Sequence, residues 1–173
     1  MSVAWEGGSN MGLFYWVFGR ATGPRIVRPL ISDIAVPIAG DDGMPATKNQ
    51  IGAIERLVCE PPLGDRTYQQ AAAIMSARSY SKFVMDDALS KPGIGHPRRP
   101  VYLALQANLI AFIVRDPEAR SYVCGWSDKN FESGQERPPS KNVHWQQALA
   151  LLWQIVSGEG SAAVGTTDWG RLR

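Results

Sequence analysis

The stretch "VYLALQANLIAFIVRD", residues 101–116, decides the fold class of this chain, because its two interpretations lead to different architectures. Its β-branched and aromatic residues, with the polar "QAN" in the middle, indicate two strands. One buried helix that begins at Pro100 fits the periodicity almost as well. We favour the two strands, and they predict a sheet in the C-terminal half of the chain.

The residues that follow predict a strand, a loop and a helix. "SYVCGW", residues 121–126, indicates another strand, and "SDKNFESGQERPPSKN", residues 127–142, is a polar loop. "VHWQQALALLWQIVSG", residues 143–158, predicts an amphipathic helix with Asn142 as its cap and Gly158 as its stop. The apolar stripe of this helix comprises Trp145, Leu149, Leu152, Trp153 and Val156.

Two helix openings of the same form lie upstream, in "ATKNQIGAIERL", residues 46–57, and "RTYQQAAAIMSA", residues 66–77. Each places a Thr three residues before a Gln, which is the capping-box pattern of a helix start. The pairs are Thr47 with Gln50 and Thr67 with Gln70. The sequence therefore predicts two short helices, and a third helical stretch at residues 80–89 completes a compact insert over residues 46–90.

The N-terminal region predicts a β-hairpin. "GLFYWVFG", residues 12–19, and "PRIVRPLISDIAVPI", residues 24–38, are rich in aromatic and β-branched residues and are separated by the turn-like "RATG". Pro29 and Pro37 make the second run an edge or bulged strand, because proline donates no hydrogen bond to a neighbouring strand. We therefore expect an α+β fold: a hairpin, a helical insert, then antiparallel strands closed by one C-terminal amphipathic helix. The expected regions are residues 1–45, 46–91 and 92–173.

The composition is that of a globular protein. With 173 residues and 45% hydrophobic content, the chain can bury the core of one domain or two small ones. Its net charge of +2 does not by itself indicate nucleic-acid binding, but 13 of its 18 basic residues are Arg, which binds phosphate through a forked side chain. The N-terminus has no cationic start and no long apolar run, and the two Cys are far apart in the sequence. We therefore expect a cytoplasmic protein without a membrane partner.

Charge is unevenly distributed along the chain. Residues 20–28 and 92–115 each carry three Arg and no acid, whereas residues 116–137 carry five acids against three bases. The first two segments predict a basic surface that contacts nucleic acid. The predicted nucleic-acid-binding residues are Arg20, Arg25, Arg28, His96, Arg98 and Arg99. Trp5 and Trp169 lie among glycines and polar residues, so we expect them to be exposed and to dock on a partner protein.

Patterns of catalytic or metal-binding residues are weak. The spacing of His96, His144, Cys59 and Cys124 does not match a zinc site. "GSAAVGTT", residues 160–167, has Thr166 where a phosphate-binding loop needs lysine. We therefore expect no metal and no cofactor. An enzyme that uses His96 or His144 stays the third hypothesis, since neither has an identifiable nucleophile or acid beside it.

The stretch "ATKNQIGAIERL…RTYQQAAAIM" resembles a small helical module of pattern T-x-x-Q-x-x-x-I-x-x-L that accompanies some recombination, helicase and nuclease-associated proteins. The matching residues are Thr47, Gln50, Ile54, Leu57, Thr67 and Ala71. The resemblance implies a role with DNA. The leading hypothesis is a non-enzymatic nucleic-acid-binding subunit of a bacterial defence, CRISPR-type or mobile-element complex. The alternative is a protein-binding inhibitor or adaptor that docks through the acidic loop at residues 127–137.

Overall fold

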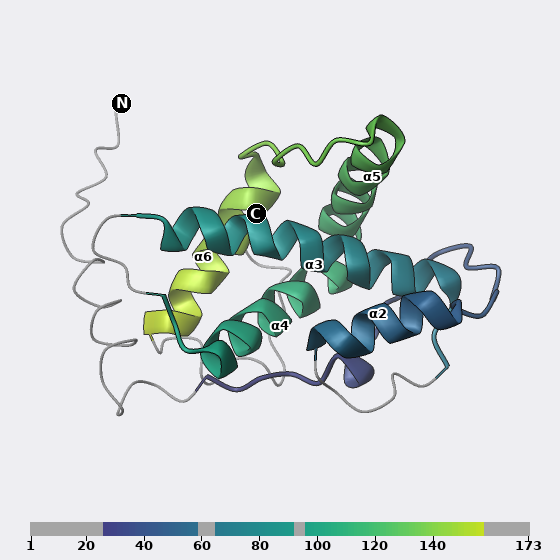
Figure 1. The fold of residues 1–173 in the computed structure, drawn as a ribbon, viewed down its shortest axis with the longest axis horizontal. Coiled ribbons are helices and arrows are strands. Elements are labelled where there is room, and N and C mark those ends of the chain that lie inside the picture. The colour runs from purple at the N-terminus through teal and green to yellow at the C-terminus, as the bar shows by residue number, and fades with distance from the viewer. Residues whose placement is uncertain (1–25, 59–64, 92–95, 158–173) are drawn as a thin grey trace.

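The computed structural model describes residues 26–58, 65–91 and 96–157. Within these ranges the protein is helical, with α-helices arranged around α3 (Figure 1). The elements are η1 (Ile31–Asp33, a 3₁₀ turn), α2 (Lys48–Val58), α3 (Tyr68–Leu89), α4 (Arg99–Arg115), α5 (Pro117–Ser133) and α6 (Val143–Ser157). α3 is the longest of them and packs against each of the other four α-helices.

The predicted α+β fold is wrong, because the described residues contain no β-sheet. The two strands predicted within residues 101–116 form the single helix α4, and the strand predicted at residues 121–126 lies in α5, which also takes in the first part of the loop predicted at residues 127–142. Every residue from Ala104 to Ala111 is buried, because α3, α5 and α6 pack around α4. A helix that is buried on all sides has no polar stripe, so its periodicity does not separate it from a strand.

The start of α5 carries a capping signal that the strand interpretation overlooked. Asp116 Oδ1 accepts hydrogen bonds from the amides of Glu118 at 2.9 Å and Ala119 at 3.1 Å. Pro117 occupies the first turn, where its missing N–H and fixed φ favour a helix. Asp-Pro at residues 116–117 therefore starts a helix where the sequence analysis expected the end of a strand.

The predicted hairpin is also wrong where the structure describes it, because residues 26–38 form no strand. The first predicted strand, residues 12–19, lies outside the described residues. The chain instead packs as an irregular segment whose apolar side chains join the helical core. Those that are fully buried are Ile31, Ile34 and Val36. The prolines that suggested an edge strand are compatible with this segment, which needs no ladder of backbone hydrogen bonds.

Side chains from the helical part of the chain replace the missing strand partner. Arg66 Nη2 donates to the carbonyls of Ile31 at 3.1 Å and Ser32 at 2.6 Å, and so holds η1. Asn108 Nδ2 on α4 donates to the carbonyl of Val27 at 2.8 Å. These bonds satisfy backbone acceptors that a sheet would otherwise have paired.

Both predicted capping boxes are present. The amide of Gln50 donates to Thr47 Oγ1 at 3.2 Å, and the Gln50 side chain accepts from the Thr47 amide at 3.0 Å. Thr67 and Gln70 make the same pair of bonds at the start of α3. An isolated antiparallel bridge between Pro45 and Thr67 places the two helix starts side by side. The two similar openings in the sequence therefore begin two neighbouring helices.

α3 is one continuous helix where the sequence analysis predicted two. Its centre is Tyr80, which is fully buried. The Tyr80 ring makes edge-to-face contacts with Tyr122 and Trp126 of α5 and Trp145 of α6, at centroid distances of 6.2, 5.8 and 5.8 Å. This ring cluster joins α3 to α5 and α6, the two helices that follow α4 in the sequence.

The C-terminal amphipathic helix is confirmed as α6. Trp145, Leu152 and Val156 are buried against the core, as the apolar stripe predicts. Asn142 caps the helix by accepting a hydrogen bond from the Trp145 amide at 3.1 Å. The predicted stop at Gly158 lies outside the described residues.

Candidate nucleic-acid interface

The start of α4 presents basic side chains to solvent. His96, Arg98 and Arg99 are exposed, whereas Pro97 between them is buried and anchors the segment. The first turn of α4 carries no acidic residue, and Arg98 at the N-cap position offers no side-chain acceptor. The unbonded amides and the macrodipole give a helix start a partial positive charge. This end of α4 therefore attracts anions.

The structure does not bring all the predicted binding residues together. Arg28 is half-buried in the irregular segment, whose Val27 carbonyl contacts Asn108, about 14 Å beyond Arg99 along the axis of α4. Outside the described residues lie Arg20, Arg25, Trp5 and Trp169. Of the predicted interface, the residues that the structure describes together are those at the start of α4.

A polar seam, which the sequence analysis did not predict, runs where α3 packs against α4. It consists of Arg78, Lys82 and Asp86 on α3, and of Tyr102 and Gln106 on α4 with the N-cap residue Arg98. In each row the residues are four apart, so they share one helix face. Gln106 Nε2 donates to the carbonyl of Arg78 at 3.5 Å, and Tyr102 interacts electrostatically with Lys82. The two rows therefore face each other, and we call these six residues the α3–α4 seam.

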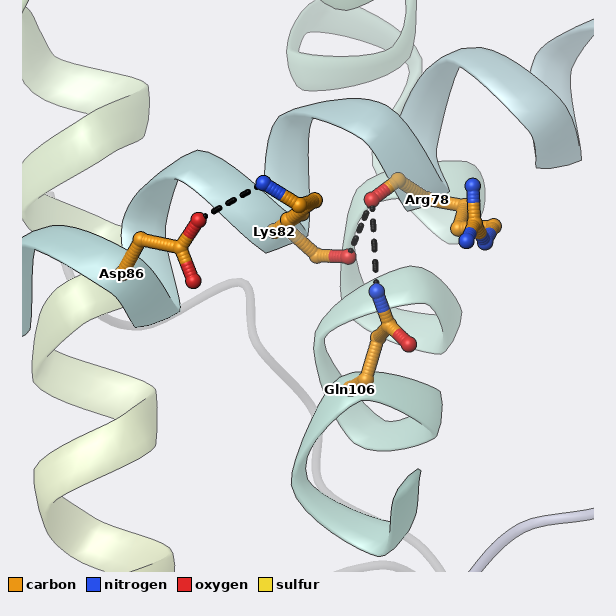
Figure 2. A network of polar contacts seen from close by, with 5 residues as sticks. Arg78, Lys82, Asp86 and Gln106 are labelled. Atoms are coloured by element: carbon orange, nitrogen blue, oxygen red, sulfur yellow. Dashed lines mark hydrogen bonds and ion pairs between the residues drawn. The ribbon is translucent and has the colours of Figure 1, made fainter. Parts of the chain in front are cut away.

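The contacts within the seam fix the backbone of α3 and engage one of its cations (Figure 2). Lys82 Nζ lies 2.8 Å from Asp86 Oδ2, and this hydrogen bond raises the pKa of Lys82. The Arg78 carbonyl accepts bonds from Ser81 Oγ at 2.8 Å and from Gln106. Figure 2 shows Lys82 turned toward Asp86, with the Arg78 guanidinium pointing away from that pair.

Arg78 differs from Lys82 because no carboxylate of the described residues forms an ion pair with it. Its side chain is half-buried, and its Nε atom is buried without a hydrogen-bond partner. Burial lowers the pKa of the Arg78 guanidinium, and the nearby Tyr102 opposes the shift. Burial likewise raises the pKa of the Tyr102 hydroxyl, which Asp86 raises further. On the α3 side of the seam, Arg78 therefore carries a positive charge that no carboxylate of the described residues neutralises.

A second exposed feature lies at the C-terminal end of α5, and Figure 1 shows this end projecting beyond the other helices. Phe131 is 90% exposed there. Trp126 Nε1 and Asn130 Nδ2 both donate to the carbonyl of Arg137 at 3.0 Å, so the following loop is held against the helix. The exposed acids around Phe131 in the sequence are Asp128, Glu132 and Glu136. We call residues 126–137 the α5 tip.

A shallow pocket of about 250 Å³ lies beside the paired starts of α2 and α3. Several polar groups at or beside this pocket already make hydrogen bonds within the protein. Thr67 Oγ1 donates to Asp41 Oδ2 at 2.7 Å, the Gly43 amide donates to Asp41 Oδ1 at 3.1 Å, and Arg66 binds the carbonyls of η1. These bonds stabilise the loop before α2, so we assign the pocket a structural role.

The described residues give little support to catalytic chemistry. No three His, Cys, Asp or Glu side chains among them lie close enough to share a metal ion. His144 stacks on Tyr122 with ring centroids 5.3 Å apart, and its Nδ1 is buried without a hydrogen-bond partner. Burial raises the pKa of the Cys124 thiol, which disfavours the reactive thiolate. None of the helices that the structure describes combines the length and the apolar character needed to cross a membrane.

No protein-family model, curated protein or solved structure matches this chain. The resemblance of residues 46–77 to the recombination-associated helical module therefore stays a prediction. The structure confirms the helices of that stretch, and these are explained by capping and packing.

Proposed function

We propose that this chain binds nucleic acid, with DNA preferred to RNA, through the start of α4. It would act as a non-enzymatic subunit of a larger nucleoprotein assembly, of a bacterial defence, CRISPR-type or mobile-element kind, in the cytoplasm. The observation that carries the proposal is the exposure of His96, Arg98 and Arg99 at the positive end of α4, where the first turn has no acid. The resemblance of residues 46–77 adds support for DNA.

The local structure suits phosphate. Arg98 and Arg99 each carry a fork of N–H donors that matches two phosphate oxygens. Pro97 and Pro100 limit the backbone freedom that binding would remove, and burial of Pro97 ties the segment to the core. Contacts of this kind position a nucleic acid without reading its sequence. We therefore expect an affinity that depends on salt more than on sequence.

The test is the double variant Arg98→Ala/Arg99→Ala, with affinity measured by fluorescence anisotropy over a range of salt concentrations. Affinity should fall similarly for all sequences, and the salt slope should drop by about 1.4–1.8, from 0.7–0.9 per lost phosphate contact. The matched control is Arg115→Ala/Lys129→Ala, which removes the same charge from exposed positions on α4 and α5 away from this end. We would abandon the proposal if the wild-type protein showed no salt-sensitive binding, or if the two double variants behaved alike.

The exposure of Phe131 favours a second candidate, the protein-binding adaptor. A large aromatic side chain can anchor a protein interface by filling a pocket of the partner. Trp126 and Asn130 hold the loop behind Phe131, and the α5 tip carries three acids and two bases, so an apolar pocket in a mildly basic surface would complement it. This partner could be a neighbouring subunit of the proposed assembly.

The adaptor hypothesis is tested with Phe131→Ser, and with Tyr68→Ser as the control at another exposed aromatic residue. A protein that co-purifies in stoichiometric amount with wild type should be lost from Phe131→Ser and kept by Tyr68→Ser. Nucleic-acid binding should stay unchanged in both. Retention of the partner by Phe131→Ser would remove the α5 tip from the interface.

A further inference from the structure

The α3 row of the α3–α4 seam has two cations, Arg78 and Lys82, and one acid, Asp86. Asp86 offsets Lys82 through their 2.8 Å contact. Arg78 has no such counterpart in the described residues, although arginine stays charged at any physiological pH. The unneutralised charge on the α3 row is therefore a single positive one, which suits an anion of one negative charge, such as a phosphodiester or a carboxylate.

The environment of Arg78 makes this lack of a partner informative. Protein interiors rarely leave a buried donor unbonded, and a half-buried cation without an anion is unfavourable. Arg78 Nε is such a donor, and because it is shielded from solvent, an anion would meet the Nη atoms of the same guanidinium. Tyr102 lies close enough to Arg78 to influence its pKa, and its hydroxyl can donate as well. Arg78 and Tyr102 are therefore the two donor side chains that an oxyanion at this place could use.

The position of Arg78 relates this place to the start of α4. Gln106, whose side chain contacts the Arg78 carbonyl, lies two turns after Arg98, or about 12 Å along the helix axis. Nucleotides of one stacked strand are spaced by about 3.4 Å, so about 3–4 of them cover this length. Tyr102 lies midway between the two arginines in the seam. A single strand can bend its backbone toward a half-buried group, whereas a duplex is stiff over a length of about 150 base pairs.

We propose that Arg78, with the Tyr102 hydroxyl as a second donor, binds one backbone phosphate of a single-stranded nucleic acid that runs along the α3–α4 seam from the start of α4. This inference rests on the proposed function, and it adds the strand type and a second contact point. A carboxylate shares the required charge, but the seam leads from Arg78 to the arginines at the start of α4, and a chain of phosphates can occupy both places at once.

The test measures anisotropy with labelled oligothymidylates of about 4–12 nucleotides, the range that single-strand-binding domains occupy, and with duplexes of equal length. Arg78→Gln should weaken single-strand binding about tenfold or more at low salt and lower the salt slope by about 0.7. Arg115→Gln is the control, because it removes the same charge at the far end of α4.

Tyr102→Phe should weaken binding about two- to tenfold without changing the salt slope, because the Tyr102 hydroxyl is neutral. Arg78→Lys, which keeps the charge, should keep most of the slope if Arg78→Gln proves unstable by circular dichroism.

The outcomes separate this inference from the proposed function. If Arg98→Ala/Arg99→Ala weakens binding but Arg78→Gln behaves like Arg115→Gln, the contact at Arg78 is wrong and the proposed function stands. Tighter binding of duplex than of single strand would overturn the strand type. If Arg78→Gln weakened the binding of polyglutamate but not that of oligothymidylate, the site would be assigned to an acidic protein and the proposal would be overturned. Absence of any binding by the wild-type protein would overturn both.

Discussion

The start of α3 and its middle are stabilised by different interactions. At the start, Thr67 forms a capping box with Gln70 and donates to Asp41, so short-range hydrogen bonds hold the first turn. In the middle, Tyr80 packs edge-on against three aromatic rings from α5 and α6. A hydrogen bond adds little net free energy because water competes for it, whereas burial of a large ring adds several kcal/mol.

The difference also concerns sequence separation. The partners of Thr67 lie within 26 residues, and the capping box itself spans three. The partners of Tyr80 are more than 40 residues away, on helices that must already be in place. Variants at the two regions should therefore differ in size of effect, with the largest losses at the ring cluster.

The largest effect is expected from Tyr80→Ala. Removing a fully buried ring that contacts three others should lower the free energy of unfolding by about 3–5 kcal/mol. The measurement is chemical denaturation followed by circular dichroism. Tyr68→Ala is the control in the same helix: Tyr68 is 49% exposed, so its loss should change stability by no more than about 0.5 kcal/mol. Equal losses for both variants would show that the ring cluster is not the centre of the core.

A smaller loss is expected from Thr67→Ala. This change removes the acceptor of the Gln70 amide and also the donor to Asp41, which lies 2.7 Å away. The expected cost is about 1–2 kcal/mol, the upper part of the range for a lost N-cap. The midpoint of urea denaturation reports it. Thr67→Ser, which keeps the hydroxyl, should recover most of the loss, and failure to do so would point to the methyl group instead.

Thr47→Ala should cost less, about 0.5–1 kcal/mol, although its capping box is the same. Thr47 is exposed, and its hydroxyl donates only to its own box partner Gln50, at 3.1 Å. The same denaturation experiment measures it. A loss at Thr47 that equals or exceeds the loss at Thr67 would mean that Asp41 adds nothing to the second cap.

The difference between short-range capping bonds and long-range packing also explains which parts of the fold could be predicted from the sequence. The capping boxes and α6 were predicted, because they depend on a few neighbouring residues and on an apolar stripe at helical spacing. α4 was not, because residues 104–111 are buried on all sides and carry no stripe. Asp116 and Pro117 were the missed signal. An N-capping Asp followed by Pro in the first turn indicates that the next residues form a helix and not a strand.

The candidate site could be predicted only in part for the same reason. The exposure of Arg98 and Arg99 follows from their charge and their place between prolines. The lack of a partner for Arg78 does not, because it depends on which residues of α4 face α3. With α4 taken as a helix, the four-residue spacing of Arg78 with Lys82, and of Arg98 with Tyr102, would have indicated the seam.

Replacing Tyr80 by Phe has the smallest expected effect at neutral pH. The ring contacts stay, and the hydroxyl that is lost is buried without a hydrogen-bond partner in the part of the chain that the structure describes. We expect a change between zero and about 1 kcal/mol in the stabilising direction, because an unbonded buried hydroxyl loses its hydration on folding. Denaturation at pH 7 measures this change, and a loss above about 1 kcal/mol would indicate an acceptor for the hydroxyl.

Alkaline pH should enlarge the difference between Tyr80→Phe and the wild type. Burial, with a contribution from Tyr122, raises the pKa of Tyr80 in the folded protein above the value of about 10 that it has when unfolded. Above pH 10 the unfolded chain releases this proton and the folded protein keeps it, so wild-type stability falls by about 1.4 kcal/mol per pH unit from this group alone. Below pH 10 its contribution is fully present.

Phe has no proton to release, so the Tyr80→Phe variant should lose stability less steeply between about pH 10 and 11. Other alkaline groups, Tyr102 and Lys82 among them, titrate in both proteins and cancel in the comparison. Parallel pH profiles for the two proteins would show that Tyr80 reaches water in the folded state, which would contradict its place at the centre of the ring cluster.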